Sequence, residues 1–482
     1  MNNRVRFTCL VLLLLACVSA AAEFPPWQKP SAWPDRIIAT LSAGPATGFS
    51  VSWRTEEAVQ TAVAEIVKAR AGARFDVGAQ TVTAQTERFE FDPKWAEKKP
   101  SFDASSPLID PVSYHSVEFT GLQPDTLYAY RVRGAEDNWS AWQQIRTAPL
   151  DGPVEFIYFG DSQNGIRSHV SRVFEAAALV SPEARFLVHC GDLVNTSIND
   201  QGWAEWFEAG GALLRRVPSA PAAGNHDYFG LGPKDSPDRF NEAALAPFWK
   251  PQFRLPVVES LPEGLHESVY DVRYTKDLHL FVLDSTGPHF DLQLEWLEQQ
   301  FSASDARWRI VYMHHPYFSW VGDGKEPPYQ TVRRAQFDAF LAGHDVDLVL
   351  TGHRHSYQRA ESGPQVHQVD KEKRYEVDTV FLVTAMTIKR GVTKVDGWER
   401  FSQERDGNFT LTRWGDYVPI FGVIRIDGDE LVYRGLDAVG ETYDAFTLTK
   451  DAAGRKTIIN GQEAFGPVWT TETAGPYRDW RE

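Results

Sequence analysis

Cysteine is rare in this chain, with three residues among 482: Cys9, Cys17 and Cys190. Cys9 and Cys17 lie in an N-terminal segment that we expect to be processed, and only Cys190 is certain to remain afterwards. We therefore expect no intrachain disulfide, which excludes the small disulfide-stabilised class of exported domains. Stability must come from a hydrophobic core, and 482 residues give room for two or three domains.

An excess of positive charge is also missing. The formal net charge is −16, and removal of an N-terminal segment with two arginines and no acids would leave about −18. Such a chain is not expected to hold nucleic acid by bulk electrostatics. A small phosphate ligand is not excluded, because a bound metal ion can dominate the local field.

Apolar runs long enough to cross a membrane are absent, and the longest one lies at the N-terminus. Arg4 and Arg6 precede an apolar stretch over residues 7–18, and small residues follow at 19–22. This order is typical of a secretory signal peptide and is too short for a transmembrane helix. We therefore expect residues 1–22 to be a signal peptide and the protein to be exported, either to a periplasm or into the medium.

An alternative reading of the same segment is a lipoprotein signal. The letters LLAC end at Cys17 and resemble a loose lipobox, although Leu15 stands where a small residue is usual. On this alternative, Cys17 would carry a lipid anchor.

Residues 33–149 have the pattern of an all-β immunoglobulin-like sandwich. Val51 and Trp53 alternate with polar residues, as in a half-buried strand, and Trp53 would be the core tryptophan. Just before a later strand comes the signature of a tyrosine corner, formed by Leu122, Pro124, Thr126 and Tyr128. The stretch 72–111 is longer than such a sandwich needs and predicts an extra loop.

Residues 152–450 change to short, nearly continuous apolar runs that alternate with helical patterns. The runs at 154–159, 185–190, 279–284, 309–313 and 347–351 fit strands buried on both faces. Alternation of such strands with helices predicts an α/β layered domain, and a mostly β section after residue 375 completes it. Residues 451–482 are assigned to a C-terminal tail.

Polar groups follow each of these buried runs or a neighbouring loop, usually after a glycine. They are Asp161 with Gln163, Asp192, Asn225 with His226 and Asp227, His314 with His315, and His353 with His355. In α/β sheets the ends of the strands converge on one ligand site, so these groups should meet in space. A mixed set of oxygen and nitrogen donors of this size suits two borderline cations, such as Zn, Mn or Fe.

The order GD, GD, GNHD, H and GHxH resembles the calcineurin-like metallophosphoesterase superfamily. The letters GHRHSYQR, the VYMH before Pro316 and the preceding sandwich resemble its purple acid phosphatase branch more narrowly, over residues 35–450. The resemblance implies a layered β-sandwich flanked by helices, a dinuclear metal centre and hydrolysis of phosphoesters.

Roles follow from the resemblance, residue by residue. Asp161 and His355 would bind the first metal, and Asp192 would bridge both. The second metal would be bound by Asn225, His314 and His353. A hydroxide that bridges the metals would attack phosphorus, while His226 acts as an acid oriented by Asp227.

Two positions depart from the family. Asn195 stands where purple acid phosphatases have the tyrosine that gives their colour, so neither colour nor an acid optimum is inherited. Gln163 stands where the wider superfamily has a histidine. Its carbonyl oxygen is expected at or near the first metal, which should bind more weakly.

Other residues near the motifs have several interpretations. Asn164 is a candidate substrate contact, and His315 either contacts the substrate or holds the turn before Pro316. Arg359 is favoured as a structural ion-pair partner, and Tyr317, Phe318 and Trp320 either wall the pocket or pack. The favoured function is hydrolysis of small phosphomonoesters. A phosphodiesterase or nucleotide pyrophosphatase on the same centre, and a binding module with a decayed site, are the alternatives.

Overall fold

The computed structural model describes residues 29–98, 109–316, 327–364, 374–389, 396–403, 408–416 and 418–470, and also Phe318, Val366, Gly391 and Thr393. The predicted signal peptide, Cys17, Tyr317 and Trp320 lie outside these residues. Within the described part of the chain, no helix combines the length and hydropathy needed to span a membrane.

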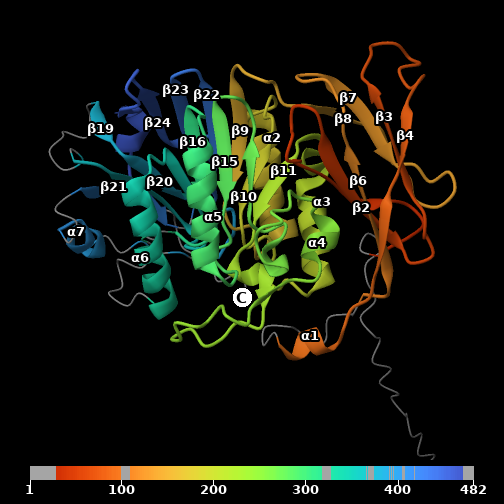
Figure 1. Ribbon diagram of the computed structural model, residues 1–482, viewed down its shortest axis with the longest axis horizontal. Helices are drawn as coiled ribbons and strands as arrows, with labels where there is room; N and C mark the ends of the chain where they lie inside the picture. The colour runs from red at the N-terminus through yellow and green to blue at the C-terminus, as the bar shows by residue number, and fades with distance from the viewer. Residues whose placement is uncertain are drawn as a thin grey trace, which may run out of the picture.

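The N-terminal part is a sandwich of two antiparallel layers, as predicted (Figure 1). One layer consists of β1 (Asp35–Thr40), β2 (Phe49–Glu56), β6 (Val112–Phe119) and β5 (Gln85–Phe89). The other consists of β4 (Gln80–Thr83), β3 (Val63–Lys68), β7 (Leu127–Val132) and β8 (Gln143–Arg146). The expected excursion holds β4, β5 and the short helix α1 (Lys94–Glu97).

Two predicted core features of this sandwich are present. Trp53 is 1% exposed, and its indole N–H donates to the Arg133 carbonyl at 3.1 Å. The backbone N–H of Gln123 donates to the Tyr128 hydroxyl at 2.9 Å, which ties the corner to the strand that follows it.

The part of the chain that follows the sandwich contributes to two large sheets. The first continues the sandwich layer through a parallel pair between β1 and β11, so one sheet of twelve strands runs through both parts of the chain. Its remaining strands, in spatial order, are β19 (Tyr375–Val377), β25 (Lys456–Asn460), β24 (Thr442–Lys450), β23 (Glu430–Asp437), β22 (Ile420–Asp427), β9 (Val154–Phe159), β10 (Leu187–Cys190) and β11 (Ser219–Ala222). The sequence patterns did not indicate this continuity. The assignment of residues 451–482 to a tail is corrected, because β25 pairs with β24 and β19 inside this sheet.

The second sheet has seven strands. In spatial order they are β14 (Tyr270–Arg273), β15 (Leu278–Val282), β16 (Trp308–Tyr312), β17 (Leu348–Thr351), β20 (Thr379–Val383), β18 (Ser356–Ser362) and β21 (Phe409–Asp416). A small pair, β12 (Tyr228–Phe229) with β13 (Ala244–Leu245), lies apart from both sheets. The central strands of both large sheets are parallel, so their carboxyl ends share one edge.

Helices cover the outer faces of the two sheets (Figure 1). On the first sheet lie α2 (Ser171–Val180) and α3 (Asp200–Arg216), and on the second lie α5 (Phe290–Ala303) and α6 (Pro328–Gly343). The described residues also contain the short helices α4 (Trp249–Gln252) and α7 (Asp396–Gln403). This arrangement confirms the predicted layered fold.

Tyrosine side chains join the two sheets across their shared core. The Tyr312 hydroxyl donates to the Ala220 carbonyl at 3.1 Å, and the Tyr270 hydroxyl donates to the Pro221 carbonyl at 2.9 Å. The Thr351 N–H donates to the Tyr158 hydroxyl at 3.0 Å. These bonds satisfy buried polar groups and fix the two sheets so that their carboxyl ends face each other.

Candidate metal centre

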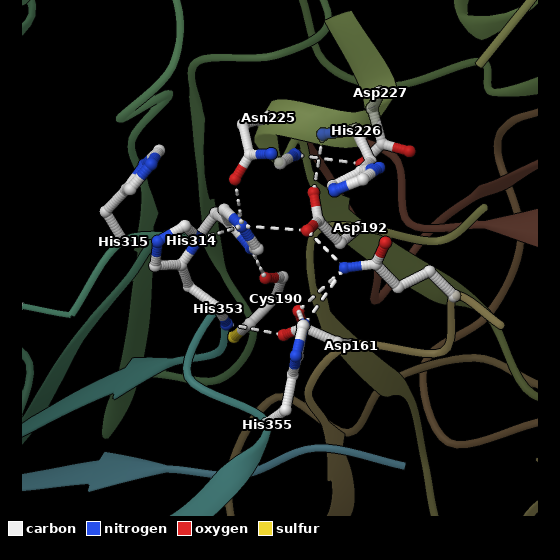
Figure 2. A network of polar contacts seen from close by, with 12 residues as sticks. Asp161, Cys190, Asp192, Asn225, His226, Asp227, His314, His315, His353 and His355 are labelled. Atoms are coloured by element: carbon white, nitrogen blue, oxygen red, sulfur yellow. Dashed lines mark hydrogen bonds and ion pairs between the residues drawn. The ribbon is translucent and has the colours of Figure 1, made fainter. Parts of the chain in front are cut away.

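The predicted ligands come together at the carboxyl edge of the two sheets, where Figure 2 shows them facing a common centre. Asp161 follows β9, Asp192 follows β10 and Asn225 follows β11. From the second sheet, His314 follows β16, while His353 and His355 follow β17. The edge of a parallel sheet is where side chains from distant segments can converge, which is why the spacing in sequence is so wide.

The backbone at this edge is held in conformations that are unusual for residues with side chains. Asp192, His353 and His355 have φ values of 52°, 73° and 51°. A Cβ on Gly352 would collide with the Asp161 carboxylate, and one on Gly224 would collide with the Asp192 carboxylate. Strained backbone and close glycine packing at the same place are typical of a functional site.

One half of the centre is built around the His314 imidazole. Its Nε2 lies 3.2 Å from Asn225 Oδ1, 3.1 Å from His353 Nδ1 and 3.3 Å from Asp192 Oδ2. Its Nδ1 lies 2.8 Å from the Cys190 carbonyl, to which it donates. Nε2 and the acceptors around it therefore point at one small, buried space.

The charges in this half of the centre favour the binding of a cation. Burial alone would lower the pKa of His314, but the Asp192 carboxylate raises it to about 9. The same buried carboxylate has a pKa well below its usual range, because the positive charges of His314 and His226 outweigh its burial. The acceptors around His314 Nε2 therefore hold a proton tightly. A divalent cation bound among them would displace that proton.

The other half is built around Asp161. Its Oδ1 accepts from the backbone N–H of His353 at 2.5 Å, and its Oδ2 lies 2.9 Å from His355 Nε2. Asp192 stands between the halves, because its Oδ2 faces both His314 and the Gln163 amide. The residues present therefore fit two cations that share Asp192.

Gln163 lies in the centre but presents the atom opposite to the one expected. Its Nε2, not its carbonyl oxygen, lies 2.7 Å from Asp192 Oδ2 and 3.0 Å from His355 Nε2. Its Oε1 is buried without a hydrogen-bond partner among the described residues. Rotation of the amide by half a turn would exchange Nε2 and Oε1, and Oε1 could then bind a cation. The Gln163 side chain therefore fits the first metal only in this rotated form.

His226 is oriented by a different group from the one expected. Its Nδ1 lies 2.6 Å from the Asn195 carbonyl oxygen. Asp227 instead accepts from the backbone N–H groups of Gly224, at 2.8 Å, and Leu193, at 3.2 Å. The prediction that Asp227 orients the imidazole is therefore corrected: Asp227 holds the loop, and the Asn195 backbone holds the ring. Burial and the Asp192 carboxylate raise the pKa of Asp227 to about 8.

The two candidate substrate contacts lie in different surroundings. His315 lines the cleft over the centre, its ring centroid is 4.4 Å from that of His353, and its Nδ1 lies 3.0 Å from Ser285 Oγ. Burial, together with the charge of His314, keeps the pKa of His315 well below its usual value. Asn164 is not among the described residues that line this cleft.

Two neighbouring residues have structural roles. Arg359 pairs with Asp444 and Glu361, both at 2.7 Å, so it is a buried ion-pair residue, as favoured. Phe318 packs against Phe381 and Phe409 and is 1% exposed, which makes it part of the core.

The sequence patterns missed several residues around the centre. Ser285 holds His315 and follows the end of β15, so the strand-end pattern could have revealed it. The cleft, of ≈ 160 Å³, is also lined by Lys234, Arg239 and Lys389. These three lie in irregular loops, where no periodic pattern marks them.

Comparison with known proteins agrees with this geometry. Residues 34–147 match the model of the purple acid phosphatase N-terminal domain, and residues 155–357 match that of the calcineurin-like phosphoesterases. The second match contains every predicted metal ligand. The chain belongs to the calcineurin-like metallophosphoesterases, in their purple acid phosphatase-like branch.

Relatives within this superfamily are distant. Purple acid phosphatase 21 of Arabidopsis thaliana is 26% identical over 51% of this chain and 53% of its own length. Purple acid phosphatase 1 of Ipomoea batatas is 23% identical over 51% of this chain and 52% of its own. The chain thus spans about half the length of the curated relatives it matches.

Solved structures show the metallophosphoesterase fold over most of the chain. A purple acid phosphatase from yellow lupin (Lupinus luteus) seeds aligns with a TM-score of 0.65 at 16% identity, and covers 93% of this chain and 78% of that one. The structure of PhoD aligns with a TM-score of 0.59 at 12% identity, and covers 91% and 94%. At these identities the comparison establishes the fold.

Proposed function

We propose that this metallophosphoesterase hydrolyses small phosphomonoesters with two divalent cations. The observation that carries the proposal is the convergence of side chains from five segments on one buried space around Asp192, with His314 Nε2 within 3.3 Å of three other ligand atoms. When bound, such cations supply Lewis acidity to phosphoryl oxygens and make water nucleophilic near neutral pH.

The ligand roles follow the two halves of the centre. Asp161, His355 and the rotated Gln163 would hold the first cation, and Asn225, His314 and His353 the second. Asp192 would hold both and keep them at a fixed separation. The His314 Nδ1–H bond to the Cys190 carbonyl sets the tautomer that leaves Nε2 as the ligand atom.

His226 is the proposed acid for the leaving oxygen. It lines the cleft, and its Nδ1–H is held by the Asn195 carbonyl, so the proton it transfers is carried by Nε2. An imidazole held in this way can protonate an alkoxide as it departs.

The metals are proposed to be Mn, Zn or Fe(II). The donors are carboxylate, amide and imidazole groups, and the position of the colour-giving tyrosine is filled by Asn195. Nitrogen and oxygen donors without thiolate or phenolate suit borderline divalent ions. We expect the loaded protein to be colourless.

The test uses purified full-length protein stripped of metal and reloaded with Mn, Zn or Fe(II) in turn. Hydrolysis of p-nitrophenyl phosphate well above that of bis-p-nitrophenyl phosphate supports a monoesterase, and the reverse order indicates a diesterase. Hydrolysis of neither ester with any metal would overturn the proposal in favour of a binding module. Asp305→Asn, at an 84% exposed surface carboxylate, is the matched control for carboxylate variants of the centre.

We also propose that the protein is exported and acts on small phosphate esters outside the cytoplasm. Support comes from the signal-like residues 1–22 and from the acidic net charge of −16, which disfavours nucleic acid. Mass spectrometry of the mature N-terminus would show cleavage near residue 22, or a lipid on Cys17 if the lipoprotein alternative holds. An intact N-terminus in the native host would contradict export.

A further inference from the structure

We propose that the cleft selects substrates that carry a second anionic group beside the scissile phosphate. The residues that would bind this group are Lys234, Arg239 and Lys389, called here the basic rim. This inference rests on the proposed phosphoesterase function and names a substrate class for the same site.

The basic rim is formed by two segments that are far apart in sequence. Lys234 and Arg239 lie in the loop between β12 and β13, and Lys389 lies in the loop after β20. All three line the cleft that is also lined by Asp192, Asn225, His353 and His355. Three basic side chains therefore gather around one cleft in a chain whose formal net charge is −16.

The rim cations are not used to hold the fold together by ion pairs. Within the described residues, none of the three forms a salt bridge, whereas the buried Lys450 and Lys456 both pair with Asp345 and Asp347. A cation that lines a ligand cleft without a carboxylate partner is available to an anionic ligand.

Arg239 is held in place by groups that do not neutralise it. Its Nη1 donates to the Gly232 carbonyl at 2.6 Å, and its guanidinium carbon lies 5.8 Å from the Phe240 ring and 5.7 Å from the Tyr329 ring. Burial lowers the pKa of this guanidinium. An arginine fixed by a carbonyl and two rings keeps its remaining N–H donors for a phosphate or carboxylate.

The rim carries more positive charge than one phosphoryl group needs. Two divalent cations, the carboxylates of Asp161 and Asp192 and a hydroxide nucleophile sum to about +1, so a phosphomonoester dianion leaves about −1. The three rim charges exceed this by about two. The excess matches a further phosphate or carboxylate on the same substrate.

The test compares substrate pairs that differ by one anionic group. Fructose 1,6-bisphosphate is paired with fructose 6-phosphate for a second phosphate, and 3-phosphoglycerate with glycerol 3-phosphate for a carboxylate. In the metal-loaded wild type, we expect kcat/KM to be higher for the more anionic member. In Arg239→Gln and Lys389→Gln, the ratio within a pair should fall about tenfold, mainly through KM, which corresponds to ~1.4 kcal/mol. Which pair responds distinguishes phosphate from carboxylate.

A binding measurement that does not depend on turnover accompanies it. Calorimetric titration should show tighter binding of 3-phosphonopropionate than of propylphosphonate to the wild type, and loss of this difference in the double variant Arg239→Gln/Lys389→Gln. The control is Lys276→Gln, which removes one charge at a 63% exposed side chain paired with Asp151.

The outcomes separate this inference from the proposed function. Unchanged ratios in the rim variants, with p-nitrophenyl phosphate hydrolysed by the wild type, would overturn the inference alone. An equal fall for both members of each pair would also overturn it, since the rim would then bind the scissile phosphate. Absence of hydrolysis by the wild type would overturn the proposed function itself.

Discussion

Two clusters of largely buried charged side chains can be compared in this molecule. In the metal centre, Asp161 and Asp192 are surrounded by histidines and amides, with no lysine or arginine among the side chains that contact them in the described residues. In the second cluster, Arg36 and Arg54 of β1 and β2 meet Asp35 and Asp200, where Asp200 begins α3. The two clusters contain the same kinds of carboxylate in opposite surroundings.

In the second cluster, each arginine is paired with a carboxylate. Arg36 lies 2.7 Å from Asp200, and Arg54 lies 2.6 Å from Asp35 and 3.4 Å from Asp200. Although burial opposes it, the carboxylates of Asp35 and Asp200 hold the pKa of Arg54 above its usual value. Two positive and two negative groups balance here, so the cluster serves to join the sandwich to α3. The metal centre has an excess of acceptors, and this imbalance is what identifies it as a site for cations.

The largest effect should come from the shared carboxylate of the unbalanced cluster. Asp192→Asn should lower kcat/KM by about 10³-fold or more, or ~4 kcal/mol, because neither cation is then held by a shared charge. The rise in melting temperature that added metal gives the wild type should also shrink. Steady-state kinetics and thermal melts with and without metal check this. Near wild-type turnover, with Asp305→Asn as the control, would count against the shared role.

Substitutions in the balanced cluster around Asp200 should lower the stability of the protein and leave its kcat nearly unchanged. Asp200→Asn leaves two buried arginines short of a partner and should lower the free energy of unfolding by about 3–5 kcal/mol. Urea denaturation measures this, and kcat of the folded fraction should stay within about twofold. If this variant does not fold, Arg54→Lys, which loses the two-pronged bond to Asp35, gives a milder test of about 1–3 kcal/mol. Loss of kcat with unchanged stability would break the comparison.

Removal of the proposed acid should slow the reaction and leave the metals in place. His226→Ala removes the imidazole that the Asn195 carbonyl holds, and with it the proposed proton donor to the leaving oxygen. The value of kcat should therefore fall about 10²-fold. Elemental analysis should find the same metal content as in the wild type. Empty metal sites in this variant would show instead that His226 is a ligand.

The smallest expected effect concerns the weaker half of the centre. Gln163→His places an imidazole beside Asp161 and should tighten the first metal about tenfold, ~1.4 kcal/mol, since borderline cations prefer imidazole to an amide. Gln163→Ala is the paired variant and should loosen it. Calorimetric metal titrations check both, and weaker binding in Gln163→His would mean that the amide is not at a metal position.

Much of the site could be predicted because its signals are local. The run over residues 154–159 and the Asp161 that follows it are read from a few letters, and the same holds for His314 after β16. The residue type sets which donor atom a side chain offers to a metal. The place of that side chain at the edge of the sheet follows from the alternation of strands and helices. The partner of His226 could not be found in this way, because a backbone carbonyl at Asn195 has no sequence signature.

The amino-acid sequence by itself determined the layered α/β fold, the N-terminal sandwich and the kinds of donor atoms at the centre, because apolar periodicity and residue type act over a few residues. Only the tertiary structure decided which atom of Gln163 faces Asp192, that Asp227 braces a loop, that one sheet joins both parts of the chain and that three basic side chains line the cleft. These features depend on distances between segments that are far apart in the chain, and those distances exist only after the sheets have packed.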